Sequence, residues 1–235
     1  RGITLGNQWR LGNFDMAVLL DRDERPAQLL FQAGVPGRIG YDRPAALRFL
    51  TKALPRTERG KSEIHWSLRL AKAAGGANVD ERTELFLNSI PADFFSKWNV
   101  RPKGYVLIHP GSEATVPYKR WPLDRFAETA HRLLEKEETL VLTGLASEQG
   151  MAGAFPNHPR CRALFGKTSL EDLIHLIANS RILITNDTGP SHIAAALGVA
   201  CIAITGFADP KIYHPYPNPH RAVYHPILCS PCFGS

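Results

Sequence analysis

The sequence predicts an α/β protein built on parallel, doubly wound sheets, and three observations lead to this prediction. From residue 105 onward, short apolar runs alternate with amphipathic helical segments. The apolar runs are only four or five residues long, which is typical of strands covered on both faces. Polar turns that contain glycine follow several of these runs, and parallel sheets bind ligands beyond the carboxyl ends of their strands. This alternation favours a parallel sheet with helices on both sides.

The second half of the chain has the more regular pattern. Strands are expected at residues 105–108, 139–143, 162–165, 181–185 and 201–205. Helices are expected at residues 123–135, 169–178 and 191–197, with a short helix near Glu148. Ser169 and Asp172 have the spacing of a capping box, which indicates a helix start at that point.

The first half gives fewer elements. A buried strand is expected at residues 14–20, a short strand at residues 38–41, and a further strand at residues 85–87. Helices are expected around residues 27–31, ending at Gly34, and at residues 61–74, ending at Gly75. Residues 90–104 contain Pro91 and Pro102, which is typical of a connection between domains. We therefore predict a domain at residues 1–98, including this connection, and a second at residues 99–235.

Composition and charge narrow the class of protein. The 235 residues are 44% hydrophobic, carry a net charge of +6 and include four cysteines. Few, scattered cysteines favour a reducing cytosol, and the longest uncharged run, residues 193–208, is shorter than the roughly 20 residues of a membrane span. Nine basic and three acidic residues lie between Arg38 and Lys72. This excess indicates either a solvated surface or a face for an anionic acceptor or lipid. Aromatic spacing for nucleic-acid stacking is not evident.

The segment Asn186-Asp187-Thr188-Gly189-Pro190-Ser191-His192 is the strongest functional signal. It joins a predicted strand to a small-residue helix. The first backbone N–H groups of such a helix and the positive end of its dipole favour an anion. Pro190 suits the first helical turn because its missing N–H costs nothing there. We therefore expect a phosphate-bearing ligand at this junction, with Asp187 and His192 beside it.

Three more motifs follow other predicted strands. They are His109-Pro110-Gly111-Ser112 leading to Lys119-Arg120-Trp121-Pro122, Thr143-Gly144 with Glu148, and Gly166-Lys167-Thr168-Ser169-Leu170. Ser112 and Lys119 offer a hydroxyl and a positive charge to phosphate, and Glu148 offers a carboxylate to ribose hydroxyls. Trp121 is expected to pack rather than to bind. Each motif is weak alone, but their occurrence at successive strand ends points to one nucleotide site.

Taken together, these motifs resemble glycosyltransferase family 9, the ADP-heptose–lipopolysaccharide heptosyltransferase family. The strand-end motifs fit, as do Arg38-Ile39-Gly40-Tyr41-Asp42-Arg43, Thr205-Gly206-Phe207-Ala208-Asp209-Pro210 and Cys229-Ser230-Pro231-Cys232. The resemblance implies the GT-B architecture, in which two Rossmann-like domains bind an acceptor and a nucleotide sugar. It implies an inverting transfer of heptose, or a related sugar, from ADP-heptose to a lipopolysaccharide-core acceptor at the inner face of the inner membrane.

Site roles carry over by position. The resemblance implies that Asp187, Thr188 and Gly189 bind the donor diphosphate and its sugar side, and that Ser112 also meets phosphate. Lys119 and His192 would stabilise the departing ADP, Glu148 would bind ribose, and Thr168 would lie near adenine. We expect no metal and no cofactor, because Lys119 and helix dipoles can balance the charge on the leaving group.

One catalytic group of the family has no counterpart here. The resemblance places the general base on an aspartate after the opening strand of the first domain, and we expect this chain to start downstream of that strand. From this and from the ends at Arg1 and Ser235 we expect a fragment, with an incomplete first domain, that is inactive by itself.

Several alternatives stay open. A sugar-nucleotide epimerase of the same fold and a non-catalytic nucleotide-binding module both fit a phosphate site. The hypothesis of a dinucleotide-dependent oxidoreductase is weakened because no Gly-x-Gly-x-x-Gly turn follows a predicted strand. Asp21-Arg22-Asp23 resembles a metal motif but is expected to be a solvated turn. Cys229 and Cys232 could form half of a zinc site, but no second pair of ligands lies near them in the sequence, and their role is left open.

Overall fold

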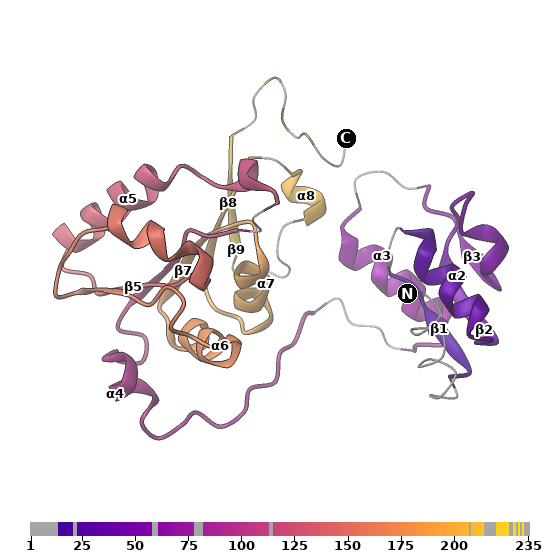
Figure 1. Ribbon diagram of the computed structural model, residues 1–235, viewed down its shortest axis with the longest axis horizontal. Helices are drawn as coiled ribbons and strands as arrows, with labels where there is room; N and C mark the ends of the chain where they lie inside the picture. Colours follow the sequence, from indigo (N-terminus) through magenta and orange to yellow (C-terminus); the bar gives the residue numbers. More distant parts are fainter. Residues whose placement is uncertain are drawn as a thin grey trace. The chain divides into compact units, whose positions relative to one another are not determined.

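The computed structural model describes residues 14–20, 23–57, 61–77, 82–112, 115–206, 208–213 and 220–225, together with Leu228, Ser230 and Cys232. The chain forms two compact units, Arg1–Glu81 and Arg82–Ser235 (Figure 1). No helix among the described residues is long and apolar enough to cross a membrane.

The second unit is built on a six-stranded sheet. Its strands are β4 (Val106–His109), β5 (Leu140–Leu142), β6 (Cys161–Ala163), β7 (Ile182–Asn186), β8 (Cys201–Thr205) and β9 (His220–Tyr224). Their order is β6-β5-β4-β7-β8-β9, and every pairing is parallel. The chain runs outward from β4 to β6 and then returns to the other side of β4 with β7. The predicted parallel, doubly wound sheet is therefore confirmed, and its direction reverses between β4 and β7.

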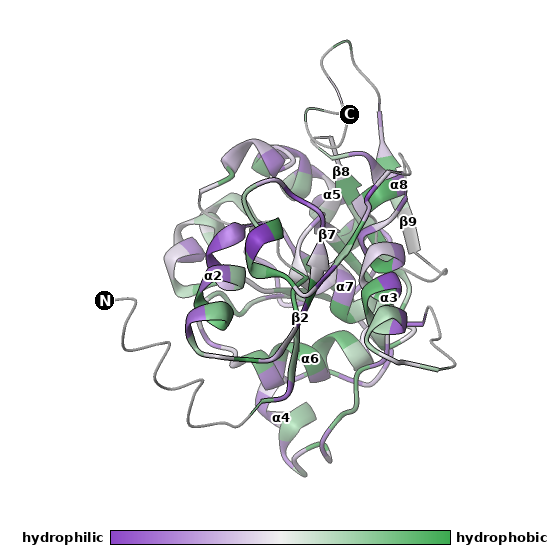
Figure 2. Ribbon diagram, turned by 90° about the vertical axis from the view of Figure 1, so that its right-hand side faces the viewer, coloured by the Kyte–Doolittle hydropathy of each residue, from purple (hydrophilic) through white to green (hydrophobic). Residues whose placement is uncertain are grey.

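Helices cover both faces of this sheet. They are α4 (Phe94–Trp98), α5 (Leu123–Glu135), α6 (Leu170–Asn179), α7 (Gly189–Ala196) and the short α8 (Pro210–Tyr213), with 3-10 turns η2 (Pro117–Lys119) and η3 (Ala146–Ala154). In Figure 1, α5 lies on one face of the sheet and α6 and α7 on the other. Figure 2 shows α6 mostly in green, in keeping with its apolar sequence.

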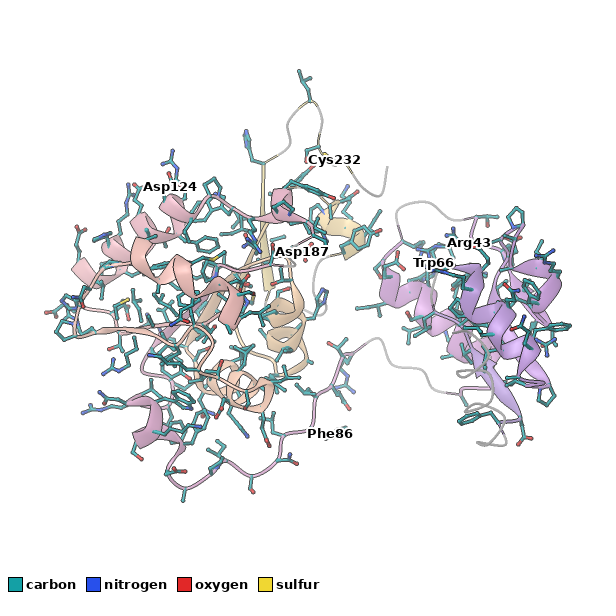
Figure 3. The ribbon with its side chains drawn as sticks, in the orientation of Figure 1. Arg43, Trp66, Phe86, Asp124, Asp187 and Cys232 are labelled. Atoms are coloured by element: carbon teal, nitrogen blue, oxygen red, sulfur yellow. The ribbon has the colours of Figure 1, made fainter. Side chains whose placement is uncertain are left out.

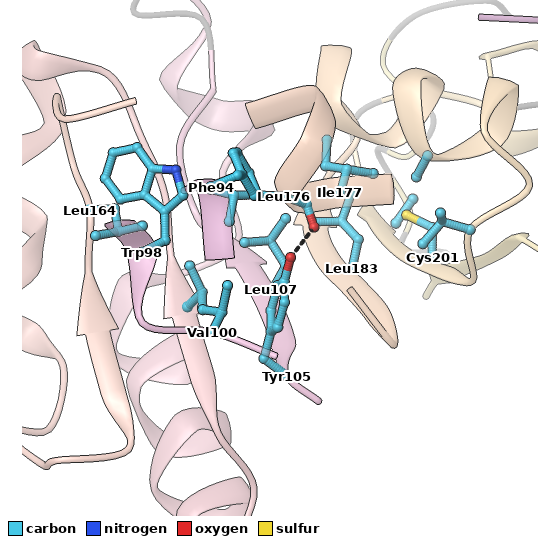
Figure 4. Packing of buried hydrophobic residues seen from close by; sticks show 14 residues of the cluster. Phe94, Trp98, Val100, Tyr105, Leu107, Leu164, Leu176, Ile177, Leu183 and Cys201 are labelled. Atoms are coloured by element: carbon cyan, nitrogen blue, oxygen red, sulfur yellow. Dashed lines mark hydrogen bonds between the residues drawn. The ribbon is translucent and has the colours of Figure 1, made fainter. Parts of the chain in front are cut away.

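The alternating side chains of the strands produce two separate cores. On β4, Leu107 joins one cluster with α6 and α7, while Val106 and Ile108 join the other with α5. This alternation is what a strand buried on both faces requires. The cluster of Figure 4 also includes a hydrogen bond from the Tyr105 hydroxyl to the carbonyl oxygen of Leu176, at 2.5 Å. Tyr105 can be fully buried because this bond satisfies its polar atom.

The first unit has a smaller sheet. Its strands β1 (Met16–Val18), β2 (Gly37–Tyr41) and β3 (Lys52–Leu54) are parallel and lie in that order. Helices α2 (Glu24–Gln32) and α3 (Glu63–Ala73) and the 3-10 turn η1 (Leu47–Phe49) accompany them. Asp23, the described part of the Asp-x-Asp sequence, is the N-cap of α2 and accepts a hydrogen bond from the Arg25 N–H.

Several details differ from the sequence prediction. Residues 85–87 form no strand, because no other strand pairs with them and Phe86 is 89% exposed. Strand β1 has three residues rather than seven, and Met16 and Val18 on it are exposed rather than buried. Helix α4 was not predicted, although it buries Phe94 and Trp98 in the core of the second unit. Strand β9 occupies a stretch expected to be a surface loop, because β8 offers it an edge to pair with.

Candidate functional site

The predicted site residues follow neighbouring strands of the second sheet. Thr168 follows β6, Glu148 follows β5, Ser112 follows β4, and residues 187–189 follow β7. Carboxyl ends of parallel strands meet at one edge, and the reversal point between β4 and β7 is where open α/β sheets bind ligands. Figure 3 labels Asp187 at this edge.

Asn186 connects the two strands at the reversal point. Its side chain is fully buried, and its Nδ2 donates to the carbonyl oxygens of Pro110 at 2.7 Å and Gly111 at 3.3 Å. Its Oδ1 accepts from the backbone N–H of Trp121 at 2.8 Å. One amide therefore fixes the turn after β4 and the start of the Trp121 segment against β7. Trp121 packs on Phe126 with ring centroids 5.0 Å apart, as a packing residue would.

Ser112, Arg120 and Glu148 form a hydrogen-bonded group. Arg120 donates from Nε to the Ser112 hydroxyl oxygen at 3.0 Å and from Nη2 to the Ser112 carbonyl oxygen at 2.7 Å. Its Nη2 also pairs with Glu148 Oε1 at 3.4 Å. The Glu148 carboxylate accepts the backbone N–H groups of Ser112 at 3.2 Å and Leu145 at 2.9 Å. Ser112 is thus held firmly at the end of β4.

Two glycines make room for the Glu148 carboxylate. A Cβ on Gly111 would lie 2.3 Å from Glu148 Oε2, and a Cβ on Gly144 would lie 2.5 Å from the Phe165 ring. Any larger residue at either position would displace a buried neighbour. The glycines in the His-Pro-Gly-Ser and Thr-Gly motifs therefore have a steric role beneath the site.

His109 lies under the same turn and is buried. Burial lowers the pKa of His109 to about 4, although the nearby Glu148 carboxylate acts in the opposite direction. One ring nitrogen, Nδ1, lies 3.1 Å from the Thr143 hydroxyl. At neutral pH this imidazole is uncharged and serves as part of the floor of the site.

The start of α7 is arranged differently. Its N-cap Thr188 makes no side-chain capping bond, and the Thr188 hydroxyl lies 3.3 Å from the Asn186 carbonyl oxygen instead. A Cβ added to Gly189 would meet nothing within 4 Å. His192 is exposed one turn further on. The space beside Gly189 is therefore open, and the positive end of the helix dipole can act on an anion there.

Lys119 and Asp187 meet at a small hollow. Thr205, Gly206 and Ala208 complete its lining. This places the predicted leaving-group lysine beside the residues that follow β7. The hollow joins the ends of β7 and β8 to the 3-10 turn η2.

Thr168 lies furthest along the edge. Its loop turns at Gly166, whose φ is +69°, and the Gly166 N–H donates to the Gly144 carbonyl oxygen at 2.9 Å. Ser169 then caps α6, and its hydroxyl accepts from the Asp172 N–H at 3.0 Å while Asp172 accepts from the Ser169 N–H. The predicted capping box is confirmed, and it fixes the loop that carries Thr168.

The sequence analysis did not single out Arg120 and Asn186 as site residues. Both lie inside motifs that were quoted, but their partners are 8 to 76 positions away in the chain. No local spacing signals such bonds. Among the described residues no three His, Cys, Asp or Glu side chains gather as a metal site. Cys229 lies outside the described residues.

In the first unit, α3 carries part of the basic excess. Arg56 and Arg69 lie over the Trp66 ring, with 4.9 and 5.3 Å to its centroid. Arg56 also pairs with Glu63 at 2.7 Å. Figure 3 labels Trp66 and Arg43 in this unit. These contacts place two guanidinium groups over the Trp66 ring, where cation–π attraction stabilises them.

Comparisons with known proteins agree with the geometry. The family model for glycosyltransferase family 9 (heptosyltransferase) matches residues 3–235. A lipooligosaccharide heptosyltransferase 2 of Haemophilus influenzae is 37% identical over 246 residues, which cover 90% of this chain and 67% of that protein. A lipopolysaccharide heptosyltransferase 2 of Escherichia coli is 27% identical, over 95% of this chain and 70% of that protein.

Solved structures give the same fold. The structure of the E. coli ADP-heptose lps heptosyltransferase II has a TM-score of 0.75 at 24% identity, covering 96% of this chain and 75% of that chain. An E. coli heptosyltransferase solved with ADP has a TM-score of 0.78 at 19% identity, covering 96% and 71%. At these identities the likeness establishes the fold, which is the predicted GT-B type.

Proposed function

The chain belongs to glycosyltransferase family 9, and on this premise we propose that it transfers a heptose, or a related sugar, from ADP-heptose to the core of lipopolysaccharide. Its relatives of known name are lipopolysaccharide and lipooligosaccharide heptosyltransferases. The protein is a glycosyltransferase, and the identity of donor and acceptor is the proposal.

The order of the site residues along the sheet edge is the observation that carries this proposal. From β6 to β7 it runs Thr168, Glu148, Ser112 and then Asp187 to Gly189. The roles assigned to them run adenine, ribose, phosphate, and then diphosphate with sugar, in the order of the parts of an ADP-sugar. Three strand spacings amount to about 14 Å, a length that suits an extended nucleotide.

The reaction would be an inverting displacement. An acceptor hydroxyl attacks the anomeric carbon, the bond from that carbon to the diphosphate oxygen breaks, and ADP leaves with the bonding electron pair. Lys119 beside the hollow, the start of α7 and His192 would stabilise the charge that gathers on the diphosphate. We assign the base that takes the acceptor proton to no residue of this chain, and the proposal uses no metal ion or cofactor.

Glu148 would bind ribose through the hydrogen-bond acceptor positions of its carboxylate that the protein does not use. Its carboxylate accepts two backbone N–H groups and the Arg120 guanidinium. A carboxylate offers about four lone-pair positions, so ribose hydroxyls can still donate to it. We therefore keep Glu148 as a ribose ligand that is also firmly anchored.

The acceptor side would use the basic first unit. Residues 38–72 contain nine basic and three acidic residues. This positive charge suits a phosphorylated, lipid-linked saccharide at the inner face of the inner membrane. If so, the first unit should bind vesicles that contain anionic lipid, and rising salt should weaken this binding because screening shortens the reach of the charges. Binding that is insensitive to salt would contradict the electrostatic face.

The donor assignment is tested by titrating the chain with ADP, UDP, GDP and NAD while its melting temperature is followed. A ligand of the folded state raises this temperature by mass action. We expect ADP to stabilise selectively, and Lys119→Ala and Asp187→Ala to abolish the shift. Lys136→Ala and Asp124→Ala remove the same charges from exposed positions on or beside α5 and should leave it intact (Figure 3).

The other outcomes separate the alternatives. Preference for UDP would contradict the ADP-sugar donor and favour an epimerase of the same fold. ADP binding that survives both Lys119→Ala and Asp187→Ala would contradict the site assignment while leaving the family intact.

A further inference from the structure

Arg120 and its partner Glu148 together bind every polar group of Ser112. The Ser112 hydroxyl and carbonyl oxygens accept directly from the guanidinium, at 3.0 and 2.7 Å. The Ser112 N–H donates to Glu148, which is itself paired with Arg120. The backbone and side chain of this serine are therefore fixed by one arginine and its carboxylate partner.

The direction of these bonds determines what the serine can do. A guanidinium has N–H donors and no acceptor, so Arg120 can only donate to the Ser112 oxygen. The hydroxyl hydrogen must therefore point away from Arg120. A hydroxyl fixed in this way is a prepared donor for a phosphate oxygen.

We infer that Arg120 is a positioning residue of the nucleotide site, acting on the donor phosphate through the Ser112 hydroxyl rather than by its own contact. This inference rests on the proposed function, because it names phosphate as the group that Ser112 meets. In this role the charge of Arg120 is balanced by Glu148 and not by the ligand. The Glu148 side chain is 5% exposed, and the Arg120 side chain is 27% exposed.

Lysine cannot replace arginine in this role. The bonds leave from two different nitrogens of one planar group, and they end on a hydroxyl, a carbonyl and a carboxylate. An ammonium is a point charge without this fork. Arg120→Lys should therefore keep the charge beside Glu148 but lose the orientation of Ser112.

The experiment measures ADP affinity by calorimetry for the full chain and for Ser112→Ala, Arg120→Met and the double variant. Each single change should weaken ADP binding about tenfold. The double variant should bind ADP about as well as the more affected single variant, because both changes remove one shared interaction. Arg120→Lys should behave like Arg120→Met. Arg125→Met is the control, since Arg125 is 60% exposed on α5 and paired with Glu128.

Additive losses in the double variant would overturn the inference, because Arg120 would then act on the ligand independently of Ser112. Unchanged affinity in Arg120→Met, with the fold intact by melting temperature, would overturn it as well. If Arg120→Met does not fold, Arg120→Lys supplies the same comparison.

A second measurement is independent of any nucleotide. Hydrogen exchange at the Ser112 and Leu145 amides, both bonded to Glu148, should become faster in Arg120→Lys and stay unchanged in Arg125→Met. Unchanged exchange at both amides would overturn the role of Arg120 in fixing Ser112. If the unmodified chain failed to bind ADP while this exchange changed as expected, the proposed donor would be wrong, and the hold of Arg120 on Ser112 would stand.

Discussion

The two sides of the candidate site are built on different physical principles. The braced rim, made of Ser112, Arg120 and Glu148 after β4 and β5, is fixed by side-chain hydrogen bonds and a mostly buried ion pair. The open rim, residues 187–192 after β7, has no side-chain cap on its helix and open space above Gly189. One rim owes its geometry to distant partners, and the other to its local backbone.

This difference indicates how the site divides its work. Fixed donors and acceptors cost little reorganisation when a ligand binds, which suits the orientation of the ribose and phosphate of the donor. An uncapped helix start lets a ligand complete the hydrogen bonding that the protein leaves open. Changes to the braced rim should therefore reduce stability and binding together, whereas changes to the open rim should reduce binding alone.

The largest effect is expected where the two rims are joined. Asn186→Ala would leave the carbonyl oxygens of Pro110 and Gly111 and the Trp121 N–H without their buried partner. We expect a loss of about 3 kcal/mol or more in the free energy of unfolding, since each stranded group costs about 1 kcal/mol or more. Chemical denaturation measures this loss.

Asn179→Ala is the matched control. Asn179 makes one side-chain bond, to the His175 carbonyl oxygen at 3.0 Å, so its loss should be about 1 kcal/mol. Equal losses in the two variants would contradict the bridging role of Asn186.

A pH effect is expected next, from the floor of the braced rim. The folded-state pKa of His109 is about 4 against an ordinary value of 6.5. Between these values the unfolded chain binds a proton that the folded chain does not, so stability falls as pH drops from 6.5 and the loss levels off below about 4. The total is at most about 3 kcal/mol.

The His109→Gln variant should lack this part of the pH dependence of stability, which denaturation midpoints measured at several pH values will show. His131→Gln removes an exposed histidine of α5 and should keep it. An unchanged pH profile in His109→Gln would mean that His109 is not held neutral by its burial.

The smallest effects come from a matched pair of glycines, one from each rim. Gly111→Ala would force a Cβ to within 2.3 Å of Glu148 Oε2, and such overpacking costs about 1–3 kcal/mol. Gly189→Ala meets open space and a φ that alanine adopts, so stability should change by less than about 1 kcal/mol. ADP binding should nevertheless weaken in Gly189→Ala, because the added methyl group lies where the phosphate approaches.

Melting temperature and ADP calorimetry on these two variants separate the rims. Comparable destabilisation by both would show that the rims do not differ. Full ADP affinity in Gly189→Ala would exclude a phosphate at the start of α7.

The sequence allowed the fold to be predicted best where the pattern was longest. Helix α5 (Leu123–Glu135) and strand β8 (Cys201–Thr205) have the predicted bounds, because periodicity and apolar runs are local signals. Strands β3 and β9 were missed, since each is defined by an edge that a distant strand provides. Residues 85–87 have a strand-like composition and no partner.

The site divides in the same way. The glycine, proline and helix start of the open rim can be recognised from adjacent residues. Arg120 and Asn186 could not be recognised, because their meaning lies in bonds to Ser112, Glu148 and Pro110 that only the folded chain brings into reach. Sequence reasoning therefore singled out the residues proposed to contact the ligand, but not the residues that hold them in place.

The contact between Gly111 and Glu148 also has a consequence for how such sequences can vary. The Glu148 carboxylate occupies the space that a side chain at position 111 would need. A Cβ added to Gly111 would lie 2.3 Å from Glu148 Oε2. A substitution at one position therefore requires a change at the other, because a larger residue at position 111 leaves room only for a shorter side chain at position 148. Among related sequences these two positions should covary, and a repertoire of functional variants selected at both sites would show the coupling directly.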